Sequence, residues 1–584
     1  MSGQAKFLAK KHLAIAVMLT FVALGFRLFI ALRLPTDEPD DGRLYARIAN
    51  NLLDHHVYTI ATEEPFEPTY IRLPGYPLFL AAVYKLFGHD NNTAVRVIQA
   101  VVDTVTCWLI AWLALAWTPL AWELEKRRRA LLIALALAAS CPYLAIYVAT
   151  ILTEIWTAFF ATLCVLAASL GLRSRITKKQ IGWWALAGLA GGGATSFRPD
   201  SGLFVAAVGG TLALVGLARA LSQWRAARKS NQPDKTPQAH SAARQALAKT
   251  VLQGAVLTLG FVLAIAPWTI RNARVFGVFM PIAPAQANMP DEFVPRGFIL
   301  WLKTWVDDVK YTETVEWAMD VRAIHIEQIP ETAFDSPDER DRVAALLASY
   351  NKEVEPPAPS AKPEIEDEAA AQPAPPAEAA PDNDETNPSD NDESPSDDAA
   401  SNDDASNDEE PPEAAEPPKF EGEMTPDIDA GFMEIAAERI HRHPLRYYVV
   451  MPLRRAASLW FDTHSQYYPF QGELLPLKDL DSDLHQQYWL PLFAGLTWLY
   501  TLLAALGAWV MWRWCDSRRW LLMLALLVLP RLAFLSTLEN PEPRYVVELF
   551  TFVMAAASLP FAGPVWSGAL RWLRRQSSDS PASG

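Results

Sequence analysis

The sequence has few of the residues from which soluble catalytic and metal sites are commonly built. Only four cysteines occur in 584 residues, no two of them form a CxxC motif, and no HExxH motif or clustered His/Cys set is present. The sequence therefore gives no basis for a disulfide framework or a zinc site. It also lacks a GxxxxGK[ST] loop and a GxGxxG motif after a strand, so soluble nucleotide chemistry has no support.

Long hydrophobic runs are abundant instead. A bilayer core about 30 Å thick requires roughly 20 apolar residues per crossing helix. About ten windows approach that length. They are Leu13–Leu34, Val95–Trp117, Leu131–Val148, Ile151–Leu172, Trp183–Phe197, Gly202–Leu221, Val251–Trp268, Trp489–Trp512, Trp520–Leu535 and Val546–Pro564. The first window is too long for a signal peptide and lacks a small-residue cleavage site, so we expect a retained span. The sequence predicts an all-α polytopic membrane protein with about ten transmembrane helices.

The acidic balance of the chain comes from one segment. The formal net charge is −15, yet 24 acids and two lysines lie between Glu353 and Glu423, so the remainder carries about +7. By the positive-inside rule, basic loops are cytoplasmic, and here every second loop is basic, which places both termini in the cytoplasm. Residues 35–93, 271–488 and 537–544 then face the other side. The basic clusters are Lys6 to Lys11, Lys126 to Arg129, Arg173 to Lys179, Arg225 to Lys229, Arg513 to Arg519 and Arg571 to Arg575.

The acidic segment also marks a boundary in the outside part of the chain. It is rich in Pro, Ala, Ser and acids and nearly lacks large apolar residues. Such a segment cannot bury enough surface to offset its ordering entropy, so we expect a disordered spacer rather than a partner-binding tail. The predicted organisation is a first span (1–34), a first outside loop with two interfacial helices and a candidate catalytic Asp (35–93), spans two to seven (94–270), an outside domain in two parts, mixed or helical (271–352 and 424–488), the acidic insertion (353–423), the last three spans (489–564) and a cytoplasmic tail (565–584).

The first outside loop opens with acidic residues. It reads DEPDDGRLYARIANNLL directly after the first apolar run. Leu44, Tyr45, Ile48 and Leu52 share one face of a helix of about three turns. This helix is too short to span and amphipathic enough to lie on the membrane surface. Asp40 or Asp41 then has two interpretations. It caps the helix by accepting backbone N–H bonds, or it acts as a general base at the water–lipid boundary.

An arginine follows in the same loop. Arg72 precedes the rigid turn Pro74-Gly75-Tyr76-Pro77, and Pro77 suits the first turn of a helix. The apolar helix predicted after it has about ten residues, again too short to span. A guanidinium at this boundary can hold a lipid-borne phosphate in bidentate fashion.

Other predicted outside ends of spans carry charges too. Each of these residues alone is explained by a snorkelling anchor. Arg531 lies inside an apolar run, where an arginine usually faces protein or a cavity. The convergence of the set on one face indicates an anionic lipid headgroup as ligand. The set is Glu154, Arg198, Asp200, Arg271, Arg274, Arg531, Glu539, Glu542, Arg544 and Tyr545.

These motifs in this order resemble the GT-C glycosyltransferases, in particular the group of protein O-mannosyltransferases and lipid A aminoarabinose transferases. The resemblance rests on DGRLYARIANNLL, IRLPGYPLFLAAVYKLFG, VRVIQAVVDT, LTE, PWTIRNARVFGVF and PEPRY. It covers most of the chain outside the acidic insertion. It implies sugar transfer from a polyprenyl-phosphate donor to an acceptor hydroxyl on a lipid, glycan or protein, at the outer face of an inner (plasma) membrane of the cell envelope, by direct inverting displacement.

The resemblance also implies residue roles. Asp41 matches the family's catalytic aspartate four residues before a tyrosine, although relatives often have Glu where this chain has Gly42. Arg72 stands where the lipid A branch has the Lys of a Lys-Pro-Pro motif. Arg72, Arg198, Arg271 and Arg544 resemble the basic contacts to the donor phosphate. The supporting residues are Asp40, Tyr45, Tyr76, Glu154, Arg531, Glu542 and Tyr545.

Several alternatives remain at this point. A flippase for lipid-linked glycans would place charges near the bilayer midplane and show an internal repeat, which the sequence lacks. A glycan ligase would share the fold but move whole polymers. A non-catalytic scaffold would leave the Asp41–Tyr45 spacing unexplained. No cofactor is implied with certainty; Asp37, Glu38, Asp40 and Asp41 could hold a divalent cation, but the expectation is no metal site. We expect membrane lipids as partners and no nucleic acid.

Overall fold

The computed structural model describes residues 10–33, 40–174, 176–229, 236–284, 288–289, 292–319, 321–351, 422–461 and 483–562. Within these ranges the chain is helical with no strand, which confirms the predicted all-α polytopic class. The predicted acidic insertion lies almost entirely outside the described residues. The helices are α1 (Lys10–Arg33), α2 (Asp40–Asp54), α3 (Gly75–Phe87), α4 (Asn92–Trp117), α5 (Leu124–Ala139), α6 (Pro142–Ala145), α7 (Glu154–Arg173), α8 (Thr177–Phe197), α9 (Gly202–Lys229), α10 (Thr236–Phe276), α11 (Arg296–Lys303), α12 (Val309–Tyr311), α13 (Pro337–Asn351), α14 (Pro426–Arg442), α15 (Met451–Phe461), α16 (Asp483–Arg513), α17 (Arg518–Leu535), α18 (Leu549–Ala557) and α19 (Leu559–Ala562).

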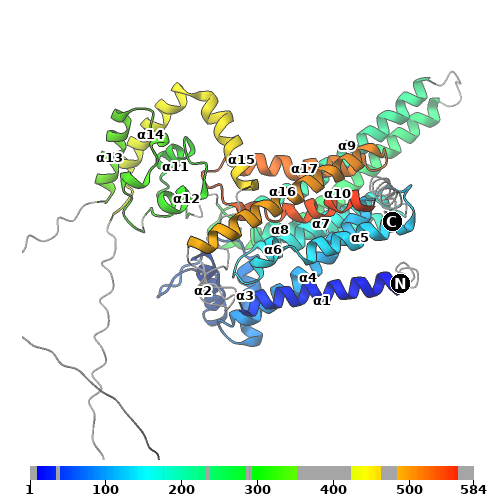
Figure 1. The fold of residues 1–584 in the computed structure, drawn as a ribbon, viewed down its shortest axis with the longest axis horizontal. Coiled ribbons are helices and arrows are strands. Elements are labelled where there is room, and N and C mark those ends of the chain that lie inside the picture. The colour runs from blue at the N-terminus through cyan, green and yellow to red at the C-terminus, as the bar shows by residue number, and fades with distance from the viewer. Residues whose placement is uncertain are drawn as a thin grey trace, which may run out of the picture.

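Most of these helices form one elongated bundle (Figure 1). The predicted count of about ten spans is not confirmed. In the described part of the chain, six helices are long and apolar enough to cross a membrane, or seven if one bent pair counts as a span. The six are Lys10–Arg33, Asn92–Trp117, Glu154–Arg173, Pro199–Ala226, His240–Phe276 and Gly495–Arg513. Helices α8, α17 and α18 pack in the same bundle but are not among these six. Helix α18 has nine residues, and the 18 residues of α17 include three arginines.

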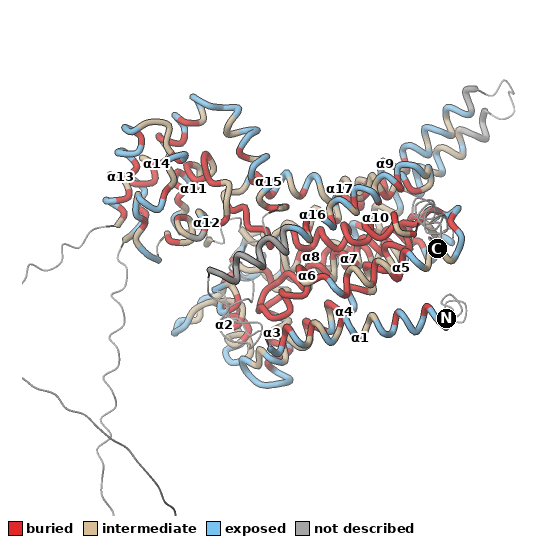
Figure 2. The backbone as a smooth tube through the Cα atoms, viewed as in Figure 1, coloured by how far each residue is buried: buried red, intermediate tan, exposed pale blue. Residues whose placement is uncertain are grey.

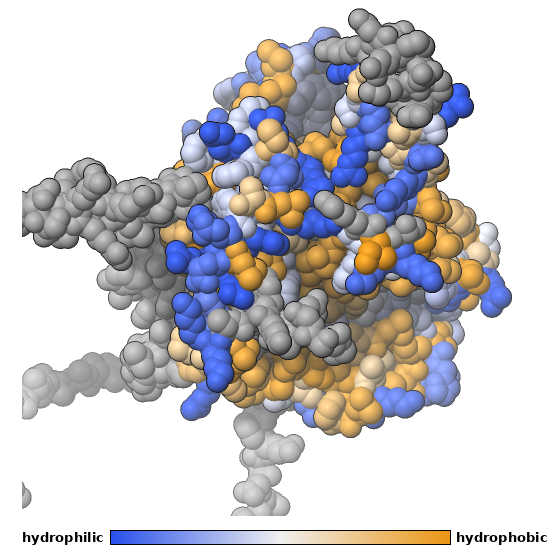
Figure 3. All heavy atoms as spheres, turned by 90° about the vertical axis from the view of Figure 1, so that its right-hand side faces the viewer, coloured by the Kyte–Doolittle hydropathy of each residue, from blue (hydrophilic) through white to orange (hydrophobic). Residues whose placement is uncertain are grey.

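The two ends of the bundle differ in chemistry. Helices α2 and α3 and the unit formed by α11–α14 lie at one end, at the left of Figure 1, which we call the site end. The described basic loops meet at the other end, the basic end, where Arg173 donates to the Thr118 carbonyl and Arg519 donates to the Leu172 carbonyl at 3.5 Å. Figure 3 looks onto the basic end and shows hydrophilic residues above a hydrophobic flank. The assignment of this end to the cytoplasm stays a prediction.

A broken helix passes through the middle of the bundle. Helix α5 ends at Ala139, and the chain resumes after a 51° bend in α6 and the short helix η1 (Ile146–Val148). The break leaves backbone carbonyls without an intrahelical hydrogen-bond donor, and the core of a membrane offers no water to replace it. Buried Arg27 on α1 donates to the Ala138 and Ala139 carbonyls at 3.1 and 3.2 Å, and its Nε lies 2.6 Å from Asp103 on α4. This ion pair therefore closes the end of α5.

The same face of α4 holds the rest of the irregular segment. Arg96 donates to the Ala149 carbonyl at 2.8 Å, and Gln99 donates to the Val148 and Thr150 carbonyls at 3.2 and 2.9 Å. The VRVIQAVVDT motif thus supplies polar groups at helical spacing to a backbone that cannot satisfy itself.

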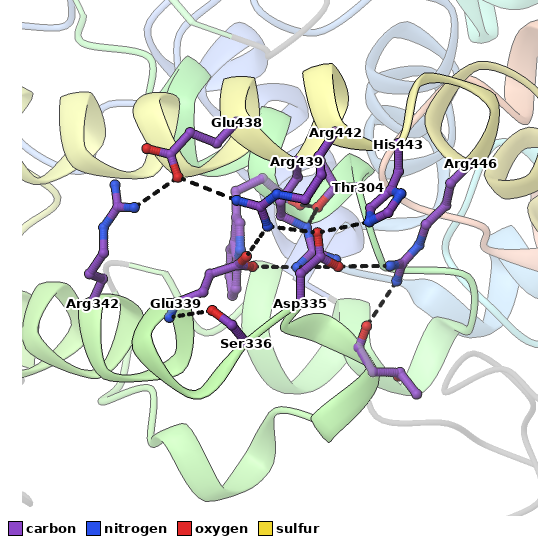
Figure 4. Close-up of polar contacts among 12 residues, drawn as sticks. Thr304, Asp335, Ser336, Glu339, Arg342, Glu438, Arg439, Arg442, His443 and Arg446 are labelled. Carbon is purple, nitrogen blue, oxygen red and sulfur yellow. Dashed lines mark hydrogen bonds and ion pairs between the residues drawn. The ribbon is translucent and has the colours of Figure 1, made fainter.

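A second unit, the outside domain, packs around α11, α13 and α14. Its core contains Phe298, Trp301 and Phe432. A set of ion pairs fastens α14 to the start of α13 (Figure 4). Buried Arg439 pairs with Glu339 and lies 3.4 Å from Asp335. This network holds together elements that are separated in sequence by the undescribed residues 352–421.

Candidate active site at the site end of the bundle

Asp41 lies between two arginines that come from distant parts of the chain. It occupies the first turn of α2. Arg72 Nη2 donates to Asp41 Oδ1 at 3.1 Å, and Arg544 Nη2 donates to Asp41 Oδ2 at 3.3 Å. The Asp41 side chain keeps 27% of its surface exposed, so a ligand has access to it. The alternative interpretation as an N-cap does not describe this carboxylate, because its contacts are with guanidinium groups.

The neighbouring acid is arranged differently. The Asp40 side chain is 94% exposed and pairs with Arg43 one turn further along α2. Asp37 and Glu38 lie outside the described residues. Within the ranges that the structure describes, no group of three or more His, Cys, Asp or Glu residues could hold a metal ion.

The two arginines around Asp41 are positioned by local turns. Arg544 belongs to the short helix η8 (Pro543–Val546), where the side chain of buried Glu542 accepts the Arg544 N–H at 3.4 Å. Arg72 precedes α3, whose first residue, Gly75, packs against the backbone of Ser196 at the end of α8. The Arg72 Nε is buried and has no hydrogen-bond partner among the described residues. An unpaired buried donor of this kind costs free energy.

A buried charge cluster lies next to this pair. Arg198, which follows α8, has Nη1 3.2 Å from Glu154 Oε1 and Nε 3.4 Å from Asp200 Oδ1. Arg531 Nη2 on α17 lies 2.7 Å from Asp200 Oδ2 and 3.2 Å from Glu548 Oε2. Arg198 and Arg531 therefore both pair with buried protein carboxylates, although Arg531 Nε and Nη1 have no partner among the described residues.

Tyr545 connects the two groups of charges. The Arg198 guanidinium lies 4.7 Å from the centre of its ring and the Arg544 guanidinium 5.2 Å. Both distances suit cation–π contact. The Tyr545 carbonyl also accepts from Arg531 at 3.1 Å, and its hydroxyl accepts from Asn540 at 3.3 Å. The PEPRY turn is thereby held from several sides.

Two tyrosines pack against each other close to Asp41. The rings of Tyr45 and Tyr76 meet edge to face with centroids 5.3 Å apart. Tyr76 is buried, and its hydroxyl donates to Gln99 Oε1 at 2.8 Å. Burial and then the charge of Asp41 raise the pKa of Tyr45, so its hydroxyl stays protonated.

Arg271 does not join either group of charges. It donates to the Thr69 carbonyl at 2.7 Å and stacks beside Tyr58, Trp268 and Phe276. Its guanidinium fastens the first outside loop to the end of α10. The family resemblance implied that Arg271, like Arg198 and Arg544, contacts the donor phosphate. The structure gives Arg271 backbone partners in the loop that carries Arg72.

The pKa of Asp41 reflects competing effects. Burial raises the pKa of its carboxyl, and the charges and hydrogen bonds of Arg544 and Arg72 lower it by more, so the net pKa lies below the ordinary value. Asp41 is therefore a carboxylate at physiological pH. With both arginines beside it, this carboxylate is a weak base.

Two contributors to this region were not among the predicted site residues. The Glu548 carboxylate forms an ion pair with Arg531 and lies 3.7 Å from Arg198. The Gln99 side-chain oxygen accepts a hydrogen bond from the Tyr76 hydroxyl. Glu548 was recognisable in RYVVELF as an acid that directly precedes an apolar run. Gln99 gave less signal, since a glutamine within a span has many structural uses.

Comparison with known proteins bears on the same region. Residues 67–226 match the family model described as dolichyl-phosphate-mannose-protein mannosyltransferase. This match covers Arg72, Tyr76, Glu154 and Arg198 but neither Asp41 nor Arg544. It confirms the resemblance to GT-C glycosyltransferases and leaves the subtype within that superfamily open. No curated protein matches the chain at a significant level.

Solved structures give distant matches. The oligosaccharyltransferase AglB from Archaeoglobus fulgidus, in complex with an inhibitory peptide and a dolichol-phosphate, aligns at 12% identity and a TM-score of 0.40, covering 98% of this chain and 52% of that one. ArnT from Cupriavidus metallidurans, bound to undecaprenyl phosphate, aligns at 13% identity and a TM-score of 0.33, covering 94% of this chain and 78% of that one. The chain spans about half the length of the archaeal protein.

Proposed function

We propose that the chain is an integral membrane glycosyltransferase. It moves a sugar from a polyprenyl-phosphate donor to an acceptor hydroxyl at the site end of the bundle, which faces the periplasm or exterior. The observation that carries the proposal is the placement of Asp41 between Arg72 and Arg544, with part of the carboxylate exposed. The match of residues 67–226 to a mannosyltransferase family supports the same reaction class.

The geometry suits direct displacement at the anomeric carbon. Arg72 and Arg544 bind the donor phosphate, where negative charge develops as the bond between the sugar and the phosphate oxygen breaks. Asp41 accepts the proton of the acceptor hydroxyl as its oxygen bonds to the sugar. Phosphate binding also favours proton transfer to Asp41. A phosphate bound to Arg72 and Arg544 offsets the positive charge that lowers the pKa of Asp41. One base and a phosphate leaving group give inversion.

The remaining arginines act on the protein rather than on the donor in this proposal. Arg198 and Arg531 orient the PEPRY turn through Asp200, Glu548 and Tyr545. Arg271 holds the loop that carries Arg72. Both roles differ from direct phosphate contact, which the resemblance implied for Arg198 and Arg271.

A flippase is a weaker reading of the same fold. It would use charged groups near the bilayer midplane. The buried Arg27–Asp103 pair is a charged group within the bundle, but backbone carbonyls of α1 and of the broken helix accept from the remaining Arg27 donors. The pair therefore acts as a structural brace.

The test is transfer of labelled sugar by the full-length protein in lipid nanodiscs. Polyprenyl-phosphate mannose is the first donor to try, because the family description names a lipid-phosphate mannose donor. We expect Asp41→Asn to lower the rate by about 10²–10⁴-fold, the usual contribution of a general base. Asp40→Asn is the matched control and keeps the wild-type rate, since that side chain points to solvent.

Three outcomes decide the matter. Equal transfer by Asp41→Asn and wild type would reject the proposed base. Absence of transfer from every donor, together with scrambling of lipid-linked sugar in vesicles, would favour the flippase. Loss of transfer in both aspartate variants would point to a general effect on α2.

A further inference from the structure

An exposed apolar strip precedes and begins α15. Its members are Leu445, Tyr448, Val449, Val450 and Leu453, from the short helix η7 (Arg446–Val450) and the residues on either side of it. Leu445 is 75% exposed and Leu453 is 65% exposed. The arc of chain that leads from α14 into α15 is largely pale blue in Figure 2, which marks exposure. Contiguous exposed apolar side chains of this kind mark a contact surface.

The strip is one face of an amphipathic segment. Leu445, Val449 and Leu453 recur at intervals of four residues and are exposed, whereas Met451, Arg455 and Leu459 recur at the same interval and are buried. The sequence therefore sets two faces. One packs on the protein, and the other faces outward.

The position of the strip along the membrane normal follows from the contact of buried Arg455 with the end of α17. Helix α17 has 18 residues, so it is about 27 Å long at 1.5 Å per residue, close to the thickness of the hydrocarbon core. Its last turn ends at Ser536, whose carbonyl accepts from Arg455 Nη1 at 3.1 Å. Since α17 begins at the basic end with Arg518, Arg455 lies where the hydrocarbon gives way to headgroups at the site end.

The other end of α15 reaches into the bundle. Trp460 donates to Thr501 on α16 at 2.9 Å, and its ring lies 5.2 Å from that of Phe550. In Figure 1, helix α15 runs from the arc above the bundle down to the site end of α17 and to α16. The exposed strip is thus continuous with the lipid-facing side of the bundle, where Leu529 and Phe534 on α17 are also exposed.

The surrounding polar groups fit a bilayer surface. Tyr448 supplies an aromatic ring with a polar tip, the type of side chain enriched at membrane interfaces. Arg454, next to Leu453, is well exposed and donates to Asp307 at 3.3 Å. An arginine at that level can meet lipid phosphate.

We propose that the strip Leu445, Tyr448, Val449, Val450 and Leu453 inserts into the lipid leaflet at the site end and anchors the outside domain on the membrane. The occupant of the surface is therefore lipid, and not a second protein. This anchor holds α14, and with it the outside domain, at a fixed height above Asp41. It does not depend on the proposed reaction, because it concerns only where this surface lies in a bilayer.

Spin labels test this directly in the full-length protein. Val449→Cys and Leu453→Cys are each labelled with a nitroxide after Cys515→Ser has removed the exposed native thiol; the other three cysteines are buried. The proteins are reconstituted in vesicles of phosphatidylethanolamine and phosphatidylglycerol. Collision with oxygen, which concentrates in lipid, is compared with collision with a water-soluble nickel chelate. Val321→Cys is the control, an apolar residue of the outside domain that is 69% exposed.

We expect the ratio of oxygen to nickel collisions to be several-fold higher at positions 449 and 453 than at position 321. A ratio equal to that of the control would place the strip in water and overturn the proposal. Low collision with both reagents would mean that protein covers the strip, which also overturns it. All sites are exposed in the structure, so labelling leaves the fold intact, and a circular dichroism spectrum checks this.

Discussion

At the scale of single residues, the site is defined by ion pairs in which two arginines, Arg72 and Arg544, share the carboxylate of Asp41. Arg72 offers Asp41 one nitrogen and keeps a buried Nε donor without a partner among the described residues. An unmet buried donor costs free energy, and Arg531 also leaves its Nε and Nη1 unpaired among the described residues. The arginines differ in exposure, since the Arg72 side chain is 24% exposed, that of Arg198 12% and that of Arg531 0%. Arg72 is therefore the most open of the three to a ligand.

This difference gives a first prediction. Arg72→Gln should raise the KM for a polyprenyl-phosphate donor by roughly 10- to 100-fold, because a hydrogen bond to a charged group is worth roughly 1.5–3 kcal/mol and each 1.4 kcal/mol is tenfold. Steady-state kinetics over a donor series measure it. Arg43→Gln, which removes an exposed arginine paired with Asp40, is the control and should leave KM unchanged. An unchanged KM in Arg72→Gln would remove this arginine from the donor site.

A second prediction concerns a buried acid in the outside domain. Burial, and then the charge of Glu539, raises the pKa of Glu316 to about 8, although Lys303 opposes the shift. The folded state therefore holds a proton on Glu316 between its ordinary pKa and about 8, where the unfolded chain has lost it. Stability from this group is present at low pH and falls as pH rises through that window.

Glu316→Gln mimics the protonated acid and should remove this loss. We expect the variant to melt at a higher temperature than wild type at pH 8 and at nearly the same temperature at pH 5. Thermal unfolding in one detergent at both pH values measures it. Glu327→Gln, at an exposed position of the same domain, is the control. A uniform shift at both pH values would contradict the proposed protonation.

At the scale of elements, close helix packing depends on glycine. Helices α8 and α10 approach so closely that a Cβ at Gly188 would lie 2.1 Å from the Leu257 carbonyl oxygen, and one at Gly192 would lie 2.5 Å from the Ala264 Cβ. The Gly188–Gly192 spacing is the GxxxG pattern that permits such contact between membrane helices. This packing sets the position of the end of α8, and hence of Arg198.

Gly188→Ala should therefore destabilise the protein by about 1–3 kcal/mol through overpacking against rigid backbone. Gly182→Ala on the same helix is the matched control, because a Cβ there meets nothing within 4 Å. That substitution should stabilise the protein by roughly 0.5–1 kcal/mol, since alanine favours the helix interior. Thermal or chemical unfolding of the two variants measures the difference, and identical stabilities would argue against a tight crossing.

The element scale also shows what the family resemblance contained. The motif VRVIQAVVDT contributed to the family resemblance, but the sequence did not indicate what its polar residues contact. The structure assigns its polar residues to the bent segment: Arg96 and Gln99 to carbonyls near residue 149, and Asp103 to Arg27. A break in a helix is not visible as such in the hydropathy of Leu131–Val148, which was read as one continuous span.

At the scale of the whole molecule, one arginine joins the outside domain to the bundle. Arg455 donates to the Val306 carbonyl at 2.8 Å and to the Ser536 carbonyl at 3.1 Å, and also to the Lys303 carbonyl. Two of these acceptors belong to the outside domain and one follows α17. Because Ser536 begins the turn that leads to Arg544, this contact links the outside domain with the site.

Arg455→Met should loosen that junction. Each buried carbonyl left without a partner costs roughly 1–3 kcal/mol, so we expect faster hydrogen exchange at the ends of α11 and α17 and a lower melting temperature. Hydrogen exchange with mass spectrometry resolves both segments. Arg454→Met, which removes an exposed arginine one position earlier, should change neither. Uniformly faster exchange throughout the bundle would indicate general unfolding instead.

The sequence by itself determined the class of fold and the separation of charge along the chain. Apolar runs long enough to cross a bilayer, and basic residues gathered in alternate loops, are local properties that need no knowledge of packing. The two short helices of the first outside loop were predicted from an amphipathic pattern and from a proline turn before a short apolar run, and they occur as α2 and α3. Boundaries near Trp183 and the count of spans were less reliable, because glycine-rich helices within a bundle need not be strongly apolar.

Only the tertiary structure decided which charges meet. Asp41 and Arg544 lie 503 positions apart, and their contact depends on how α2, α3 and the PEPRY turn pack around the end of α8. Arg271 and Arg198 look alike in sequence. Arg271 donates to a backbone carbonyl and lies beside aromatic rings, whereas Arg198 pairs with carboxylates. Partner choice between ionic groups is set by distances of a few ångströms and by burial, and neither quantity is encoded in local sequence.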